Sequence, residues 1–160
     1  MTSITSATLA DLEAIVALEN SSFCRDRFSK SQFRYLLQRP RHAVFKMTCG
    51  DTLVGYIILL DRKRSRKLRI YSIGTSPENR RLGYGSRLLD FAQEEALSRN
   101  LTTLTLEVCV CNHTALRFYL SHGYTEFGAK DGYYEDGCAA LLMKKVVQGG
   151  IKSDPSPYKN

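Results

Sequence analysis

The segment that most constrains this chain is the run from Arg80 to Ser86, Arg-Arg-Leu-Gly-Tyr-Gly-Ser. It lies between an apolar run that ends near Thr75 and an amphipathic segment from Ser86 to Arg99, an order that predicts a strand, a glycine loop and a helix. Glycine lets a ligand approach the backbone, and the first turn of a helix has N–H groups without an intrahelical partner. Such a turn binds phosphate, and the preceding arginines pair with phosphate oxygens. The run has neither the third glycine of a dinucleotide fingerprint nor the Gly-Lys-Ser/Thr of a P-loop, so it is either an anion site or a plain structural turn.

The residues after this run predict a parallel strand pair. Apolar side chains recur at helical spacing from Leu88 to Ala96, and Leu101 to Val108 alternates as a strand does, with Glu107 on the less apolar face. A strand, a helix and a second strand in this order form a right-handed crossover, and ligands bind at the carboxyl ends of such strands. We therefore expect Glu107 and the Arg80–Ser86 run to share a cleft.

The first half of the chain predicts two helices and an antiparallel strand pair. Thr8 is the expected N-cap of a helix that ends near Ser21, and Ser29 starts a second helix that Pro40 stops. The residues from Asn20 to Phe28 are then a loop. Two strands follow, 42–49 and 53–60, joined by a tight turn at Gly50-Asp51, and the second is apolar enough to be buried on both faces.

The C-terminal part predicts one more helix and a hairpin. Asn112 is the expected N-cap of a helix that carries Tyr119 on its inner side and stops before Gly123. The hairpin contains a tyrosine pair, Tyr133-Tyr134, before a last strand at 139–146; adjacent tyrosines within a strand would face opposite sides. We expect one domain over residues 1–147 and a disordered tail over 148–160, because the tail has no core-forming pattern.

Composition narrows the class of protein. The 160 residues carry a net charge of +7, which suggests an anionic ligand or partner. Residues 1–12 contain neither a basic leader nor an apolar run, and no stretch approaches the length of a membrane span, so we expect a soluble, cytoplasmic protein. The cysteines are odd in number and form no Cys-x-x-Cys pair, which favours reduced thiols over a metal site: Cys24, Cys49, Cys109, Cys111 and Cys138.

The spacing Arg80-x-x-Gly83-x-Gly85 between a strand and a helix resembles the acetyl-CoA pyrophosphate loop of the GNAT N-acetyltransferases. Further segments resemble the same family, and within it the branch that acetylates the N-terminal alanine of a ribosomal protein: Leu106-Glu107-Val108, Asn112, Leu116-Arg117-Phe118-Tyr119 and Gly123-Tyr124. The resemblance covers roughly residues 4–146. It implies an α/β fold (α+β by some schemes), a single domain with a mixed, mostly antiparallel sheet flanked by helices, whose central parallel strand pair forms the CoA cleft.

The resemblance also implies roles for individual residues. Glu107 would serve as general base and Tyr119 as general acid toward the departing CoA sulfur. Phe23 and Phe28 would line the acceptor side unless they simply pack in the core, and Tyr133 and Tyr134 would hold the first residues of a peptide. The residues implied to contact acetyl-CoA are Ile73, Gly74, Thr75, Arg80, Arg81, Leu82, Gly83, Tyr84, Gly85, Ser86 and Asn112.

Without the resemblance, Glu107 is an ordinary solvated strand charge and Tyr119 an ordinary core ring. With it, the chemistry favours a protein N-terminal α-amine as the acceptor: making such an amine neutral at pH 7 costs about 1.4 kcal/mol, against about 4.6 kcal/mol for lysine. A GNAT enzyme for polyamines, small amines or lysine stays open, as does a basic RNA- or ribosome-binding module that keeps CoA as a structural ligand.

One segment bears on that last alternative. Five of the six residues from Arg62 to Lys67 are cationic: Arg62, Lys63, Arg64, Arg66 and Lys67. This segment could contact nucleic acid or the ribosome. It could also be a solvated hairpin loop, because no aromatic residues interleave to stack bases.

Overall fold

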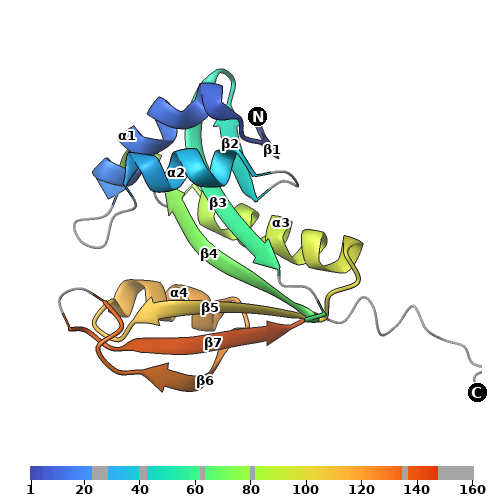
Figure 1. The fold of residues 1–160 in the computed structure, drawn as a ribbon, viewed down its shortest axis with the longest axis vertical. Coiled ribbons are helices and arrows are strands. Elements are labelled where there is room, and N and C mark those ends of the chain that lie inside the picture. The colour runs from blue at the N-terminus through green and yellow to red at the C-terminus, as the bar shows by residue number, and fades with distance from the viewer. Residues whose placement is uncertain (23–28, 40–42, 62–63, 80–81, 135–136, 148–160) are drawn as a thin grey trace, which may run out of the picture. The chain divides into compact units, whose positions relative to one another are not determined.

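A seven-stranded mixed sheet of order β1-β2-β3-β4-β5-β7-β6 organises the protein in this computed structural model (Figure 1). The structure describes residues 1–22, 29–39, 43–61, 64–79, 82–134 and 137–147. The strands are β1 (Thr2–Ser6), β2 (Val44–Cys49), β3 (Thr52–Asp61), β4 (Lys67–Thr75), β5 (Thr103–Cys109), β6 (Thr125–Lys130) and β7 (Ala140–Val146). The helices are α1 (Leu12–Ser22), α2 (Lys30–Leu37), α3 (Tyr84–Ser98) and α4 (His113–Ser121), with short 3₁₀ turns η1 (Leu9–Asp11) and η2 (Pro77–Asn79).

The chain divides into two compact units. The N-terminal unit comprises residues 1–60 and 70–91, and the C-terminal unit comprises residues 61–69 and 92–160. Among the described helices, none is both long and apolar enough to cross a membrane. The tail predicted for residues 148–160 lies outside the described residues.

Both predicted N-caps are present, although Thr8 caps the 3₁₀ turn η1 and α1 begins only at Leu12, whereas Ser29 caps α2 directly. Thr8 and Ser29 each accept a backbone N–H and are completed by a reciprocal side chain three residues later, Asp11 and Gln32 respectively. The predicted loop from Asn20 begins too early, because α1 continues to Ser22.

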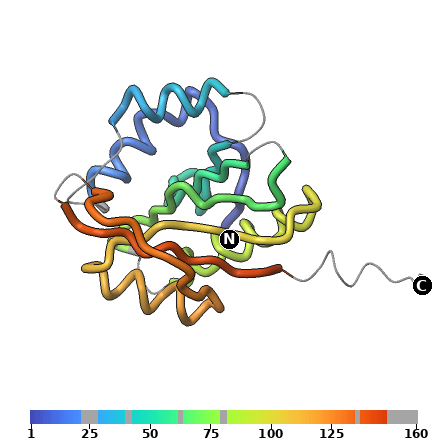
Figure 2. Tube along the Cα trace, turned by 60° about the horizontal axis from the view of Figure 1, so that its bottom comes forward, coloured from blue at the N-terminus to red at the C-terminus, as the bar shows by residue number. Residues whose placement is uncertain are grey.

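The core of the N-terminal unit lies on both faces of its strands. Figures 1 and 2 show α1 and α2 together over one face, where Ile15, Phe33 and Tyr56 are fully buried in one cluster. The first turns of α3 pack on the opposite face, with the ring centroids of Phe45 and Phe91 4.8 Å apart. This two-sided packing confirms the prediction that β3 is buried on both faces, and residues 54–59 are all buried.

The edge of the N-terminal unit contains one strand that the sequence pattern did not predict. β1 pairs antiparallel with β2 over five residue pairs, from Thr2 opposite Cys49 to Ser6 opposite Phe45. Its sequence, Thr-Ser-Ile-Thr-Ser, has a single apolar residue, so no alternating pattern marks it. The predicted turn at Gly50-Asp51 is confirmed, since Cys49 and Thr52 are register partners and Gly50 has φ +62°.

The C-terminal unit is a second antiparallel set covered by a helix. β7 pairs with β5 over seven residue pairs and with β6 on its other edge, and α4 runs along these strands (Figures 1 and 2). The predicted alternation of β5 is confirmed, because Leu104, Leu106 and Val108 are buried and the residues between them are partly exposed. Asn112 caps α4 and Gly123, with φ +92°, follows its end, as predicted.

The predicted parallel strand pair is also confirmed. β4 and β5 run parallel, with Lys67, Leu68 and Arg69 opposite Thr103, Leu104 and Thr105. The mixed, mostly antiparallel sheet of the predicted α/β class is therefore present, and the pair is its parallel element.

Candidate active site

The side chains of Arg69 and Glu107 form an ion pair at the parallel strand pair. Arg69 donates from Nε at 3.1 Å and from Nη2 at 2.9 Å, and both hydrogen bonds end on Oε1 of Glu107. The Glu107 side chain is only 15% exposed and that of Arg69 33%, so solvent screens this pair less than a surface pair. Within the described part of the chain, Oε2 of Glu107 has no partner and remains available to accept a proton.

Strand register explains why these two residues meet. Arg69 lies opposite Thr105, and Glu107 is two residues further along β5, so its side chain leaves the same face of the strand as that of Thr105. Sequence reasoning missed Arg69, although a signal was present: it is a cation between Leu68 and Ile70, both of which are buried on the other face of β4. An arginine in an otherwise apolar strand marks a polar face that the strand shares with its neighbour.

Arg69 also joins this ion pair to the tyrosine pair. Its Nη2 donates to the hydroxyl oxygen of Tyr133 at 3.2 Å. The rings of Tyr133 and Tyr134 contact each other edge to face, with centroids 4.9 Å apart and an interplanar angle of 87°. Neither tyrosine lies in a strand, because both belong to the segment between β6 and β7. The alternative in which two strand tyrosines face opposite sides is therefore wrong.

Tyr119 lies in α4 and is buried in the C-terminal unit. Its ring packs edge to face against that of Tyr124, with centroids 5.8 Å apart. Burial raises the pKa of the Tyr119 phenol well above its usual value, and the nearby Tyr134 raises it further. With this raised pKa the phenol keeps its proton at neutral pH. Among the described residues its hydroxyl makes no hydrogen bond, so it can donate one to a ligand. Arg69, Glu107, Tyr119, Tyr133 and Tyr134 are referred to below as the carboxylate–tyrosine cluster.

Asn112 has a structural role that limits what else it can do. Its Oδ1 accepts the backbone N–H of Ala115 at 3.1 Å and so caps α4. Its remaining polar group is the amide nitrogen, a donor that suits an acceptor oxygen on a ligand.

The glycine loop has the geometry that a helix-terminal anion site requires. Gly83 has φ +80°, and a Cβ added there would meet no atom of the described residues within 4 Å. α3 begins directly after it, at Tyr84, two residues earlier than the sequence predicts, so Gly85 and Ser86 lie in the first turn of a 15-residue helix. Leu82 is exposed beside the loop. Arg80 and Arg81 lie outside the described residues.

The end of β4 contains the other residues predicted to contact acetyl-CoA: Ile73, Gly74 and Thr75. The ring of Tyr56 is the neighbour that requires a glycine at position 74. A Cβ built on Gly74 would lie 2.7 Å from Cε2 of Tyr56, closer than real Cβ atoms come to other atoms. The β4–β5 pairing runs from Lys67 opposite Thr103 to Arg69 opposite Thr105, and these three residues lie beyond it.

Further predictions concern two phenylalanines and the basic segment from Arg62 to Lys67. Phe23 and Phe28 lie outside the described residues, as do Arg62 and Lys63 of the basic segment. At the start of β4 three cations are exposed: Arg64, Arg66 and Lys67. Exposure fits both a solvated loop and a contact with nucleic acid or the ribosome, so it does not separate the two.

The cysteine prediction needs correction. Cys109 and Cys138 form a disulfide, with their Cα atoms 6.4 Å apart, where reduced thiols were expected. The physical reason is the β5–β7 register, which places Cys109 opposite Ala140 and therefore beside Cys138. Cys49 and Cys111 are unbonded thiols, and Cys24 lies outside the described residues. The sulfurs of Cys109, Cys111 and Cys138 lie within 4.8 Å of one another, but a disulfide between two of them leaves a single thiol as a metal ligand.

Known proteins share the sequence pattern and the fold of this chain. The family model described as the acetyltransferase (GNAT) family matches residues 10–124. A putative [ribosomal protein bS18]-alanine N-acetyltransferase of Bacillus subtilis is 30% identical over 139 residues, which cover 84% of this chain and 89% of the relative. A [ribosomal protein bS18]-alanine N-acetyltransferase of Salmonella typhimurium is 28% identical, with 84% and 88% covered. The crystal structure of the ribosomal-protein-S18-alanine N-acetyltransferase from Escherichia coli superposes with a TM-score of 0.81 at 27% identity, covering 92% of this chain and 94% of that one.

Proposed function

Because this chain belongs to the GNAT acetyltransferase family and is an acetyl-CoA-dependent N-acetyltransferase, we propose that its acceptor is a protein N-terminal α-amine. The observation that carries the proposal is the carboxylate–tyrosine cluster. Arg69 holds one oxygen of the Glu107 carboxylate, and the other oxygen has no partner among the described residues. Arg69 also contacts Tyr133, whose ring packs against that of Tyr134.

Glu107 is the general base of this proposal. Attack on a thioester needs a neutral amine, so a proton must leave the ammonium form before or during attack. With Oε1 fixed by two hydrogen bonds from Arg69, Oε2 is the oxygen that receives this proton, directly or through a water. A base fixed in this way loses little conformational freedom when the acceptor binds.

The pKa of the acceptor amine decides how easily a single carboxylate can deprotonate it. An α-amine is neutral about one-tenth of the time at pH 7, whereas a lysine is neutral about four times in ten thousand. The difference in deprotonation cost is about 3 kcal/mol, so a single carboxylate serves an α-amine more easily than a lysine or a polyamine.

Tyr119 acts on the leaving group. Its raised pKa makes it a weak proton donor, so we assign it mainly a hydrogen bond to the departing sulfur. Two observations support this role: the Tyr119 hydroxyl has no hydrogen-bond partner among the described residues, and the side chain is buried. A hydrogen bond in a site of low dielectric is worth more than one in water.

The glycine loop and the first turn of α3 bind the pyrophosphate of acetyl-CoA in this proposal. The fit rests on Gly83, whose backbone is open to close approach, and on the N–H groups of Tyr84, Gly85 and Ser86 at the start of a long helix. Ile73, Gly74, Thr75 and the amide nitrogen of Asn112 are the remaining proposed contacts. Acetyl-CoA supplies the activated acetyl group, and these residues position it.

Tyr133 and Tyr134 are the proposed peptide-holding residues. Tyr133 is 38% exposed and Tyr134 is partly exposed, so part of each side chain is accessible to a ligand. Because a peptide backbone is read by hydrogen bonds that side chains do not alter, the acceptor's first residue should matter more than its second or third. The Salmonella typhimurium relative is named a [ribosomal protein bS18]-alanine N-acetyltransferase, and we propose an acceptor of that type for this chain.

The test is a direct comparison of three acceptors at one concentration: a peptide with a free N-terminus, its N-blocked twin with an internal lysine, and spermidine. We expect acetylation of the free N-terminus to be fastest. Faster reaction with the blocked peptide or with spermidine would overturn the proposed acceptor and leave the family assignment intact.

A further inference from the structure

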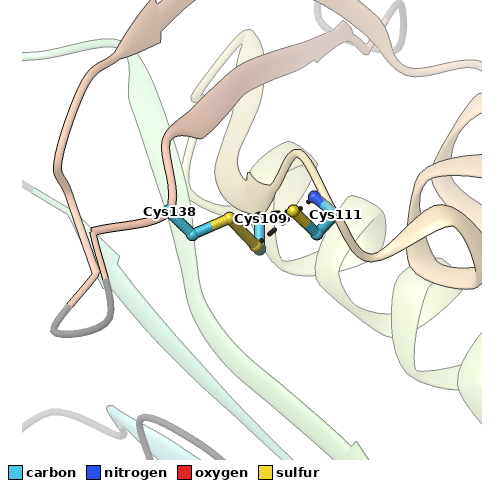
Figure 3. Close-up of side chains that lie close together, drawn as sticks. All are labelled: Cys109, Cys111 and Cys138. Atoms are coloured by element: carbon cyan, nitrogen blue, oxygen red, sulfur yellow. Dashed lines mark hydrogen bonds between the residues drawn. A yellow bond between two sulfur atoms is a disulfide. The ribbon is translucent and has the colours of Figure 1, made fainter.

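The sulfurs of Cys109, Cys111 and Cys138 lie together at the end of β5 (Figure 3). Cys109 is the last residue of β5, Cys111 follows in the turn before α4, and Cys138 precedes β7. The bond between Cys109 and Cys138 closes a loop of sequence separation 29, and Cys111 is an exposed, unbonded thiol. The mechanism proposed above uses none of the three.

Two contacts join the unbonded thiol to the disulfide. Sγ of Cys111 lies 3.5 Å from Sγ of Cys138, and the backbone N–H of Cys111 donates to Sγ of Cys109 at 3.4 Å. The first contact places a thiol against one disulfide sulfur. The second places a hydrogen-bond donor against the other sulfur, where a departing thiolate would gain negative charge.

We propose that these three cysteines form a thiol–disulfide exchange site in which Cys111 is the exchanging thiol and small dithiols are the external reactants. The Cys111 thiolate attacks Sγ of Cys138, a Cys111–Cys138 bond forms, the Cys109–Cys138 bond breaks, and the electron pair leaves on Cys109 as a thiolate. The exchange consumes no oxidant or reductant, because one disulfide replaces another. Since the Cys111 side chain is exposed, it can rotate into line with the bond that it attacks.

Exchange makes the bond accessible from outside. Cys109 and Cys138 are both only partly exposed, whereas Cys111 is exposed, so a disulfide that includes Cys111 presents its sulfur to a reductant. A dithiol then reduces it through a mixed disulfide on Cys111, and all three residues end as thiols while the reductant becomes a cyclic disulfide.

The Cys109–Cys138 disulfide also helps to position the tyrosine pair. The carbonyl of Cys138 accepts the N–H of Tyr134 at 3.1 Å, and the N–H of Gly137 donates to the carbonyl of Tyr134 at 2.9 Å. The bond to Cys109 therefore ties the backbone of Tyr134 to the end of β5, two residues from Glu107. Reduction removes this covalent tie and leaves only the hydrogen bonds.

The first test maps the disulfides of the oxidised full-length protein. After incubation at pH 8, quenching in acid, peptic digestion in acid and mass spectrometry should find both the Cys109–Cys138 and the Cys111–Cys138 bond. Acid preserves them because the thiolate is the nucleophile and acid stops exchange. A single bond whose amount does not change with incubation would overturn the proposal.

The second test compares rates of reduction by dithiothreitol. Cys111→Ser should slow reduction of the Cys109–Cys138 bond several-fold, whereas Cys49→Ser, which removes the other described unbonded thiol, should leave the rate unchanged. Equal rates in wild type and Cys111→Ser would argue against Cys111 as the exchanging thiol. A slower rate in Cys49→Ser would do the same.

A third measurement tests whether the disulfide positions the tyrosine pair, and its KM readout rests on the proposed function. Reduction should increase hydrogen exchange at the amides of Tyr134 and Gly137 and raise the peptide acceptor's KM. Unchanged hydrogen exchange would contradict the tie itself. Faster hydrogen exchange with an unchanged KM would leave the exchange site standing and count against the peptide-holding role of the tyrosines.

Discussion

Arg69 donates two hydrogen bonds to a single oxygen of Glu107, although the two residues are 38 positions apart in the chain. Side-on pairing with both donors on one oxygen fixes the direction of the carboxylate and separates its two oxygens by function. The same guanidinium contacts Tyr133, so a single cation orients both the proposed base and one of the proposed peptide-holding residues.

Replacing Arg69 should therefore lower activity without changing acetyl-CoA binding. Arg69→Met keeps an unbranched side chain but removes its charge and its donors, and we expect turnover to fall about tenfold, equivalent to about 1.4 kcal/mol in the transition state. Arg69→Lys retains the charge but cannot place two donors on one oxygen, so it should recover only part of the loss. Steady-state kcat and KM with a free-amine peptide give the comparison. Wild-type turnover in Arg69→Met would exclude a positioning role.

Glu107→Gln should lower turnover at neutral pH by about 10²-fold, because general-base catalysis contributes effects of that order. The deficit should shrink as pH rises, since more of the acceptor amine is already neutral. Glu126→Gln, an exposed glutamate on β6, is the matched control and should react at the wild-type rate. A loss in Glu107→Gln that stays constant from pH 7 to pH 9 would indicate positioning rather than proton transfer.

Gly83→Asp should abolish the rise in melting temperature that acetyl-CoA produces. At ligand one hundredfold above its dissociation constant the wild-type gain is about 2.7 kcal/mol, and an aspartate at this position would add both bulk and negative charge where phosphate binds. Gly132→Asp is the control, because Gly132 has φ +60° and a Cβ there would also meet nothing within 4 Å. Both variants bear the same kind of backbone strain, so a ligand shift retained in Gly83→Asp would refute the proposed site.

Tyr119→Phe should change how the free energy of unfolding depends on pH. Below pH 10 the phenol is neutral in both the folded and the unfolded chain; above it the unfolded chain loses this proton first, because burial raises the pKa of Tyr119 in the folded state. Above pH 10 the free energy of unfolding of the wild type should then fall by about 1.4 kcal/mol per pH unit more than that of Tyr119→Phe. Urea unfolding at pH 9, 10 and 11 measures the difference. Parallel curves for the two proteins would show that the phenol titrates normally.

Replacing Tyr133 and Tyr134 together with alanine should raise the peptide's KM and lower kcat, because positioning energy contributes to both parameters. Acetyl-CoA binding should be unaffected. Tyr35→Ala is a suitable control, since Tyr35 is an exposed tyrosine of α2 in the other unit. If the double variant showed the wild-type KM, the tyrosine pair would have no part in holding the acceptor.

Local patterns in the sequence determined most of the elements. The capping residues Thr8, Ser29 and Asn112, the turn at Gly50-Asp51 and the alternation along β5 act over a few residues, so their effect can be read without the rest of the fold. Where the local pattern is weak the prediction failed. β1 has one apolar residue and forms a strand because β2 offers it an unpaired edge.

The tertiary structure alone decided which side chains meet. The parallel β4–β5 register brings Arg69 to Glu107, and the β5–β7 register brings Cys109 to Cys138 across a separation of 29 residues. The ring of Tyr56 determines why Gly74 must be a glycine. These contacts depend on the register between strands, and shifting that register by one residue moves every side chain to the opposite face. Periodicity within one segment identifies its apolar face, but it carries no information on the register with the neighbouring strand.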